Sequence, residues 1–145
     1  MDSENKLHLF RTNINPNKIS KYLVTTFGRE RRSSLSNLRL GTTDLEIEIG
    51  RRFRIPRDAR FCKICDSQAV EDEQHFLFEC PTLAETRKPF IEKISKISLS
   101  FGNLQNADKT NFLFFNDDLT TNIQNIAAEL LIALKCIRET KRNAL

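Results

Sequence analysis

Three cysteines and one histidine occur within a short stretch of the chain, and their spacing constrains the fold more than any other feature of the sequence. They follow the pattern Cys62-x2-Cys65-x9-His75-x4-Cys80. Thiolate sulfur and imidazole nitrogen are ligands that zinc prefers, and a Cys-x2-Cys pair forms a tight turn around a metal. We therefore predict one structural Zn2+ ion, held by these four side chains in a CCHC zinc knuckle.

The predicted ligand set also limits what the metal can do. Four protein ligands fill a tetrahedral coordination sphere, whereas a catalytic zinc keeps one position for water or substrate. Metal binding instead contributes folding free energy, on the order of 10–16 kcal/mol in small zinc domains, which can order a segment with little hydrophobic core of its own. We expect a non-catalytic protein without a small-molecule substrate, in which the metal orders a segment at about residues 60–81.

The rest of the sequence predicts one domain. A chain of 145 residues, 39% of them hydrophobic, can bury a single core. We expect a flexible N-terminal arm over residues 1–14 and a single helical domain over residues 15–145. The N-terminus is too polar for a signal peptide, and no apolar run reaches the roughly 20 residues of a membrane span. Because the cysteines have a metal role and not a disulfide role, we predict an intracellular protein, nuclear or cytoplasmic, without membrane contact.

The spacing of apolar residues and the residues typical of helix ends predict a mostly α fold. Acidic residues at 71–73 are expected to lie at the start of the helix that carries His75. The predicted helices run from Asn15-Pro16 to Gly28, from Ser33 or Ser34 to Gly41, through His75 to a stop at Cys80-Pro81, from a Thr82-x-x-Glu85 capping box to Ile97, over one or two turns within 111–115, and from Asp117 and Asp118, as caps, to Arg142.

Two loops and one segment of ambiguous structure complete the prediction. Residues 51–60, which contain Pro56, and residues 98–109 are predicted as loops. The segment from Thr43 to Gly50 stays open between two structures. Leu45, Ile47 and Ile49 alternate with glutamates as in a strand, whereas Asp44 could cap a helix; we favour the helix.

Basic residues are concentrated in one part of the chain. Between Arg29 and Lys63 there are ten basic residues against five acidic ones, in a chain with a net charge of +4. Clustered arginines can bind phosphates, which favours a surface for RNA or DNA. A solvated face on which arginine pairs with glutamate explains the same charges. The eleven phenylalanines mostly lie beside Leu or Ile, so we interpret them as core residues and not as a platform for nucleobases.

A wider pattern spans about residues 35–140. It comprises Leu38-Arg39-Leu40-Gly41-Thr42, Leu45-Glu46-Ile47-Glu48, Gly50-Arg51, Ile55-Pro56-Arg57, Arg60-Phe61-Cys62, Cys65, and Val70-Glu71-Asp72-Glu73-x-His75-Phe76-Leu77-Phe78-x-Cys80-Pro81. With this pattern the chain resembles the zinc-binding C-terminal region of reverse transcriptases from non-LTR (LINE-like) retrotransposons, the reverse-transcriptase zinc-binding domain. The stretch from Arg60 to Pro81 is its most specific part. One departure is Thr43, where many relatives carry a histidine.

The resemblance implies a zinc-binding module beside a polymerase that copies RNA into DNA at a nicked target, and therefore contact with RNA or DNA. The polymerase and endonuclease parts are absent from this sequence, so we do not expect the chain alone to synthesise DNA. The resemblance and the local positive charge together point to a phosphate-contacting surface. We assign to it Arg51, Arg52, Arg54, Arg57, Arg60 and Lys63.

A zinc-stabilised protein–protein interaction module without nucleic-acid affinity is the alternative function. The long C-terminal helix carries an apolar stripe at spacings of three and four, formed by Leu119, Ile123, Ile126, Ala127, Leu130, Leu134 and Ile137. Burial in the core of the domain explains this stripe most simply. A helix-pairing face that makes a homo-oligomer is the other explanation, and the sequence leaves it open.

Overall fold

The computed structural model describes residues 14, 15, 17–26 and 28–145. Most of the predicted N-terminal arm, as well as Pro16 and Phe27, lies outside these residues. The described chain is helical and contains, in place of a sheet, one isolated antiparallel bridge between Phe61 and Val70. The predicted small, mostly α fold is therefore confirmed. Its elements are α2 (Tyr22–Thr25), α3 (Arg29–Leu40), α4 (Glu46–Arg52), η1 (Arg57–Ala59), η2 (His75–Glu79), η3 (Pro81–Leu83), α5 (Ala84–Ile97), η4 (Phe101–Asn103), α6 (Asn106–Phe114) and α7 (Thr121–Asn143).

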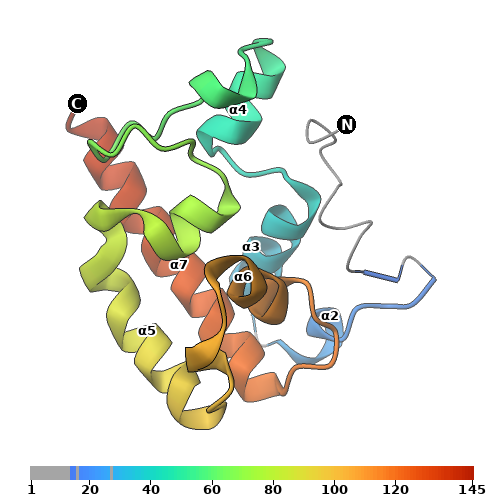
Figure 1. Ribbon diagram of the computed structural model, residues 1–145. Helices are drawn as coiled ribbons and strands as arrows, with labels where there is room; N and C mark the ends of the chain where they lie inside the picture. Colours follow the sequence, from blue (N-terminus) through green and yellow to red (C-terminus); the bar gives the residue numbers. More distant parts are fainter. Residues whose placement is uncertain (1–13, 16, 27) are drawn as a thin grey trace.

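The long helix α7 is the centre of the fold. It packs mainly against α3 and α5, which lie on different sides of it (Figure 1). Its apolar stripe supplies fully buried side chains, among them Ala127, Leu130 and Leu134, which are 0% exposed. The stripe is thus used within the chain, as expected for a core helix. Ile126 and Ile137 of the stripe are only partly buried, and a homo-oligomer through this helix stays a prediction.

Local sequence explains where α7 begins and where its packing partner α3 ends. The Thr120 hydroxyl accepts a hydrogen bond from the Ile123 backbone and caps α7. Gly41 ends α3 in the left-handed conformation, with φ of 60°, and the Thr42 N–H donates to the Asn37 carbonyl at 2.9 Å. This is the glycine stop that the sequence predicts, because a residue with a side chain is strained at positive φ.

The ambiguous segment after Thr43 is helical, as favoured. Leu45 and Ile47 are buried, and so are the intervening Glu46 and Glu48. The alternating pattern therefore does not separate a buried face from an exposed one. The glutamates are buried because each forms an ion pair, Glu48 with Arg51 and Glu46 with two basic residues described below. The helix continues to Arg52, beyond the predicted start of the following loop.

The predicted first helix is mostly wrong. Of its described residues, only Tyr22–Thr25 are helical, while Ile19 is 76% exposed and does not belong to a buried face. Three successive β-branched residues, Val24, Thr25 and Thr26, disfavour further helix, and Thr26 is extended. The next helix, α3, begins at Arg29, earlier than the predicted serine cap.

Two predicted helix caps have other partners. Thr82 does not cap α5, because its hydroxyl donates to the Ile64 carbonyl at 2.7 Å and α5 begins at Ala84 without a side-chain cap. Asp117 does not cap α7, because its carboxylate accepts from the guanidinium of Arg39 at 2.9 Å. The loop predicted for 98–109 is shorter than expected, since η4 and the start of α6 lie within it.

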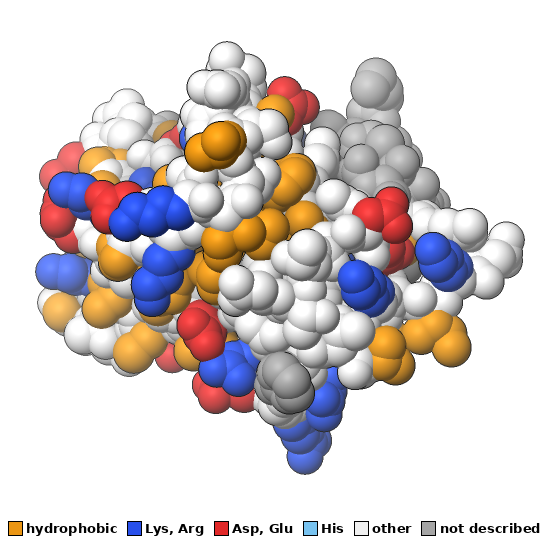
Figure 2. Space-filling model, turned by 90° about the horizontal axis from the view of Figure 1, so that it is seen from below, with side chains coloured by type: hydrophobic (Ala, Val, Ile, Leu, Met, Phe, Trp, Pro, Cys, Tyr) orange, Lys and Arg blue, Asp and Glu red, His pale blue; other side chains and the backbone are white. Residues whose placement is uncertain are grey.

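The two ends of the molecule are formed by different elements. Figure 2 shows the end remote from α4, where acidic and basic side chains lie next to each other with hydrophobic side chains between them. The opposite end is formed by α4 and the turn that follows it (Figure 1). Within the part of the chain that the structure describes, no helix has both the length and the apolarity to cross a membrane.

Candidate metal centre

The structure brings all four predicted ligands together. One ligand atom from each of Cys62, Cys65, His75 and Cys80 can be chosen so that all four lie within 4.8 Å of one another. Cys62, His75 and Cys80 are buried, whereas Cys65 is partly exposed. Side chains that lie far apart in the unfolded segment thus meet at one point, and the group is placed to hold one metal ion.

Backbone pairing positions the first two ligands. Around the Phe61–Val70 bridge, the Cys62 N–H donates to the Ala69 carbonyl at 2.8 Å, and the Glu71 N–H donates to the Arg60 carbonyl at 2.9 Å. The turn between the paired segments carries Cys65 back towards Cys62. This short hairpin leads directly into the helical turn that supplies the other two ligands.

A π-helical turn places His75 and Cys80 side by side. In an α-helix, residues five apart point about 140° away from each other, because each residue turns the chain by about 100°. Here η2 is a π-helix, and the Cys80 N–H donates to the His75 carbonyl at 2.7 Å. The wider turn brings the two side chains onto one side. π-Helical turns are rare and are frequently found at functional sites.

One ligand–ligand distance fits tetrahedral coordination. With metal–sulfur and metal–nitrogen bonds of about 2.3 and 2.1 Å, two ligand atoms on a tetrahedral ion lie about 3.6 Å apart. The observed separation between Cys65 Sγ and His75 Nε2 is 3.5 Å. Three sulfurs and one imidazole nitrogen are also a chemically suitable donor set for zinc. The residues present therefore fit a four-coordinate metal ion.

Contacts within the cluster shift the pKa values of Cys62, His75 and Cys80. A hydrogen bond with Cys62 lowers the pKa of Cys80 to about 4, and the same contact raises the pKa of Cys62. A hydrogen bond with Cys80 raises the pKa of His75 to about 9. Only a thiolate and a neutral imidazole can bind a metal. Metal binding must therefore release protons from Cys62 and His75, whereas Cys80 already favours the thiolate.

Three contacts hold the ligand segments in place, two of them from η3 and α5 and one local. The hydroxyl of Thr82, at the start of η3, holds the Cys62–Cys65 turn through the Ile64 carbonyl. The Asp72 carboxylate accepts from the His75 N–H at 2.9 Å and begins the ligand helix. The buried guanidinium of Arg87, from α5, donates to the Cys80 carbonyl at 3.0 Å. These contacts hold the ligand backbone in position.

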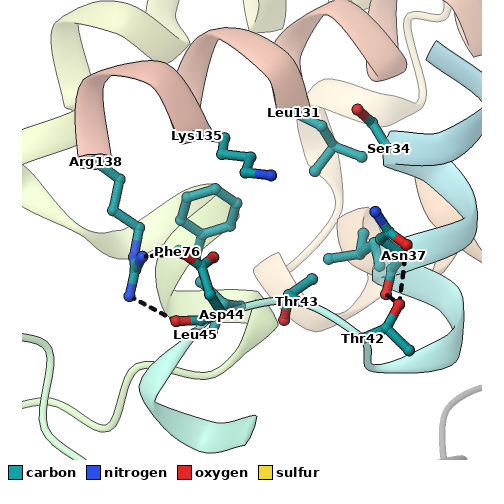
Figure 3. A pocket seen from close by; sticks show the side chains of 11 residues that line it. Ser34, Asn37, Thr42, Thr43, Asp44, Leu45, Phe76, Leu131, Lys135 and Arg138 are labelled. Atoms are coloured by element: carbon teal, nitrogen blue, oxygen red, sulfur yellow. Dashed lines mark hydrogen bonds and ion pairs between the residues drawn. The ribbon is translucent and has the colours of Figure 1, made fainter. Parts of the chain in front are cut away.

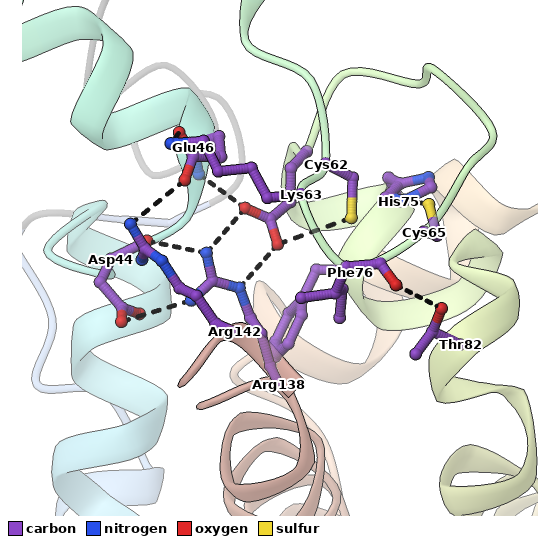
Figure 4. Close-up of polar contacts among 12 residues, drawn as sticks. Asp44, Glu46, Cys62, Lys63, Cys65, His75, Phe76, Thr82, Arg138 and Arg142 are labelled. Atoms are coloured by element: carbon purple, nitrogen blue, oxygen red, sulfur yellow. Dashed lines mark hydrogen bonds and ion pairs between the residues drawn. The ribbon is translucent and has the colours of Figure 1, made fainter. Parts of the chain in front are cut away.

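A buried ion pair joins the metal centre to α7. The Arg138 guanidinium donates twice to the Glu71 carboxylate, at 2.6 and 2.8 Å, and the two side chains are each 2% exposed. The same carboxylate accepts from the Glu46 N–H at 2.8 Å and lies 3.9 Å from Cys62 Sγ. Glu71 therefore links the ligand hairpin, α4 and α7 through one carboxylate. Figure 4 labels its neighbours Glu46, Cys62 and Arg138.

Further charges surround this pair. Arg138 also contacts Asp44, whose carbonyl accepts at 3.0 Å and whose carboxylate lies 3.3 Å away. The Glu46 carboxylate pairs with Lys63 at 3.2 Å and with Arg142 at 3.4 Å. The pairs of Arg138 with Asp44 and of Arg142 with Glu46 join residues more than 90 positions apart, so the sequence alone does not predict them.

The residues assigned to a phosphate surface fall into three groups. Arg60 is buried and donates to the carbonyls of Ile55 and Ile47, so its guanidinium supports the fold and does not face solvent. Ion pairs occupy Arg51, Arg57 and Lys63, with Glu48, Asp72 and Glu46 respectively. Arg52 and Arg54 are exposed and form no ion pair with any residue that the structure describes.

A cavity of about 230 Å³ lies beside the metal centre, between α3, residues 42–45 and α7 (Figure 3). Phe76, which follows the ligand His75, forms part of its wall. Thr43 also lines it, and the Thr43 hydroxyl is buried without a hydrogen-bond partner among the described residues. The Thr43 side chain therefore faces this cavity.

Comparisons with known proteins give no relative for this chain. No family model matches the sequence, no curated protein matches it, and no solved structure matches the fold. The geometry of the site and the residues themselves therefore carry the functional interpretation.

Proposed function

We propose that this protein is a non-catalytic zinc-binding module that contacts RNA or DNA and is similar to the C-terminal zinc-binding region of non-LTR retrotransposon reverse transcriptases. The observation that carries the proposal is the cluster of Cys62, Cys65, His75 and Cys80 within 4.8 Å. A sulfur-rich set of four ligands favours zinc over harder cations. Because the four ligands complete the coordination sphere, the ion has a structural role.

Metal analysis tests the zinc assignment. Purified full-length protein is expected to contain one zinc per chain, and the Cys65→Ser variant to lose most of it. Cys136→Ser is the matched control, because Cys136 is an exposed cysteine on α7 outside the cluster. Replacement of zinc by cobalt should give the absorption of a tetrahedral thiolate site in the control but not in Cys65→Ser. Equal metal content in both variants would refute the assignment.

Two exposed arginines support nucleic-acid contact. Arg52 and Arg54 are exposed and pair with no acidic residue of the described chain, and both lie next to the paired Arg51 on the same end of the molecule. Arginine binds phosphate in a fork with two hydrogen bonds. The resemblance to a polymerase region that acts on RNA and DNA supports the same partner.

The salt dependence of binding tests this part of the proposal. Binding of the full-length protein to an oligonucleotide should weaken as salt rises, and the double variant Arg52→Ala, Arg54→Ala should bind more weakly with a salt slope lower by about two. The control Lys88→Ala, Lys96→Ala removes the same charge from exposed sites on α5. Equal effects of the two double variants would reject this surface. No binding, together with a dimer in light scattering, would favour the protein–protein interaction module.

A further inference from the structure

One aromatic side chain at the α4 end of the molecule is exposed where core burial was expected. Phe53, directly after α4, is 74% exposed, more than any other described phenylalanine that the structure leaves at the surface. Arg52 and Arg54, both exposed, flank it in sequence. The interpretation of the phenylalanines as core residues is therefore wrong for Phe53. Core packing does not explain the exposed position of this ring, and solvation of the two flanking cations does not explain it either.

The backbone at this tip has a defined shape. The Ile55 N–H donates to the Gly50 carbonyl at 2.8 Å, and Arg54 adopts a left-handed conformation with φ of 57°. This is the arrangement of a Schellman turn at a helix end, in which glycine is the usual left-handed residue. Arginine is strained in that conformation, and strained residues of this kind cluster at ligand-binding sites. The turn exposes Phe53 together with its neighbouring arginines.

A buried arginine fixes the turn from beneath. Arg60 Nε donates to the Ile55 carbonyl at 2.9 Å, and its Nη1 donates to the Ile47 carbonyl at 3.1 Å. Its side chain passes so close to Gly50 that a Cβ atom at this position would collide with it. Arg60 thus connects the tip to the segment that carries Cys62. The exposed ring is held on a rigid support and not on a mobile loop.

We infer that Phe53 stacks on an unpaired nucleobase while Arg52 and Arg54 bind the flanking phosphates; this inference rests on the proposed function. Every nucleobase has a π-face, so an aromatic ring beside cations binds single-stranded nucleic acid with little dependence on sequence. A base inside a duplex is already stacked on both faces. The tip should therefore prefer single strands, loops or frayed ends over intact duplex.

The test compares variants at Phe53 on two probes, a short single-stranded DNA and the corresponding duplex, at one salt concentration. Phe53→Ala should weaken binding to the single strand by roughly 5- to 150-fold, the range for loss of one stacked base. Duplex binding should change less than twofold, and Phe53→Trp should retain single-strand binding. Phe61→Leu, at an exposed phenylalanine before Cys62, is the control and should leave both affinities unchanged. Metal content and circular dichroism establish that each variant is folded.

Several outcomes would overturn the inference. If Phe53→Ala binds the single strand as wild type does, or loses single-strand and duplex binding equally, the ring does not stack on an unpaired base, although the proposed nucleic-acid surface stands. If wild-type protein binds neither probe, the proposed function fails, and the inference fails with it. Binding of wild-type protein to vesicles rich in anionic lipid, without binding to either probe, would assign the tip to a membrane surface.

Discussion

Replacing Arg138 by methionine should lower the free energy of unfolding more than any surface substitution on the same helix. The methionine keeps most of the buried aliphatic contact of Arg138 but removes the guanidinium. Glu71 then remains 2% exposed with its negative charge uncompensated, 3.9 Å from the sulfur of Cys62. Its remaining hydrogen bond, from the Glu46 N–H, is neutral and cannot replace a cation.

The magnitude follows from the burial of the pair. Breaking a fully buried ion pair by removing one partner costs about 3–5 kcal/mol, because the other charge stays desolvated. For a domain of this size, that loss lowers the melting temperature by about 9–15 °C, at roughly 3 °C per kcal/mol. A loss this large would consume a substantial part of the stability of a typical domain.

Urea unfolding followed by circular dichroism measures this loss. Wild-type and variant proteins should be compared at one fixed concentration of free zinc, since metal binding to the folded state raises apparent stability. Arg142→Met is the matched control on the next turn of α7. Arg142 is 31% exposed and its contact with Glu46 is 3.4 Å long, so its loss should cost less than about 1 kcal/mol.

The double variant Glu71→Gln, Arg138→Met tests whether the uncompensated charge of Glu71 causes the loss of stability. Glutamine keeps an oxygen that can accept from the Glu46 N–H but carries no charge. Replacing Arg138 should therefore cost at least about 1 kcal/mol less in the Glu71→Gln background than in wild type. Equal losses for Arg138→Met and Arg142→Met, or full additivity in the double variant, would refute the assignment of the buried pair as the main connection between metal centre and α7.

Three further substitutions have defined expected effects on the free energy of unfolding in urea. Gly50→Ala should cost about 1–3 kcal/mol, because the new methyl group collides with the Arg60 side chain; an unchanged value would mean that Arg60 moves aside freely. Thr120→Ala should cost about 1 kcal/mol through loss of the α7 cap, and no cost would contradict the capping contact. Leu130→Ala, at a fully buried site, should cost about 2–5 kcal/mol, against less than about 0.5 kcal/mol for the 82% exposed Leu99→Ala; similar losses would contradict the core position of Leu130.

The clustering of the four candidate metal ligands and the helical class could be predicted because their signals are local. The spacing of Cys62, Cys65, His75 and Cys80 limits where the chain can bend, and those residues do meet. The stripe on α7 repeats every three or four residues and produces a buried helix. Neither signal depends on residues outside the segment that carries it.

The partners of charged residues could not be predicted in this way. Glu71 and Arg138 lie 67 positions apart, and Arg39 and Asp117 lie 78 positions apart. The local pattern predicts that Glu71 lies at the start of the ligand helix, where it interacts with the helix dipole, and that Asp117 caps α7. In the structure each carboxylate instead binds a distant arginine, which a single sequence cannot reveal.

The basic stretch illustrates the same difficulty for exposure. Arg60 and Phe53 lie in one run of charged and apolar residues. Their residue types predict an exposed arginine and a buried phenylalanine. The structure has them reversed, since Arg60 is 5% exposed and Phe53 is 74% exposed. Two backbone carbonyls and the missing side chain of Gly50 create the site for Arg60. Such a site is visible only once the turn after α4 is known.

The separation of contacts along the chain sets an order for folding. The ligands from Cys62 to Cys80 close a short loop, whereas α3 meets α7 through pairs such as Arg31 and Glu129, which are 98 positions apart. Closing a longer loop costs more chain entropy and slows the step that needs it. Metal binding by the segment from Cys62 to Cys80 should therefore come early during refolding, and docking of α3 onto α7 should be the rate-limiting step.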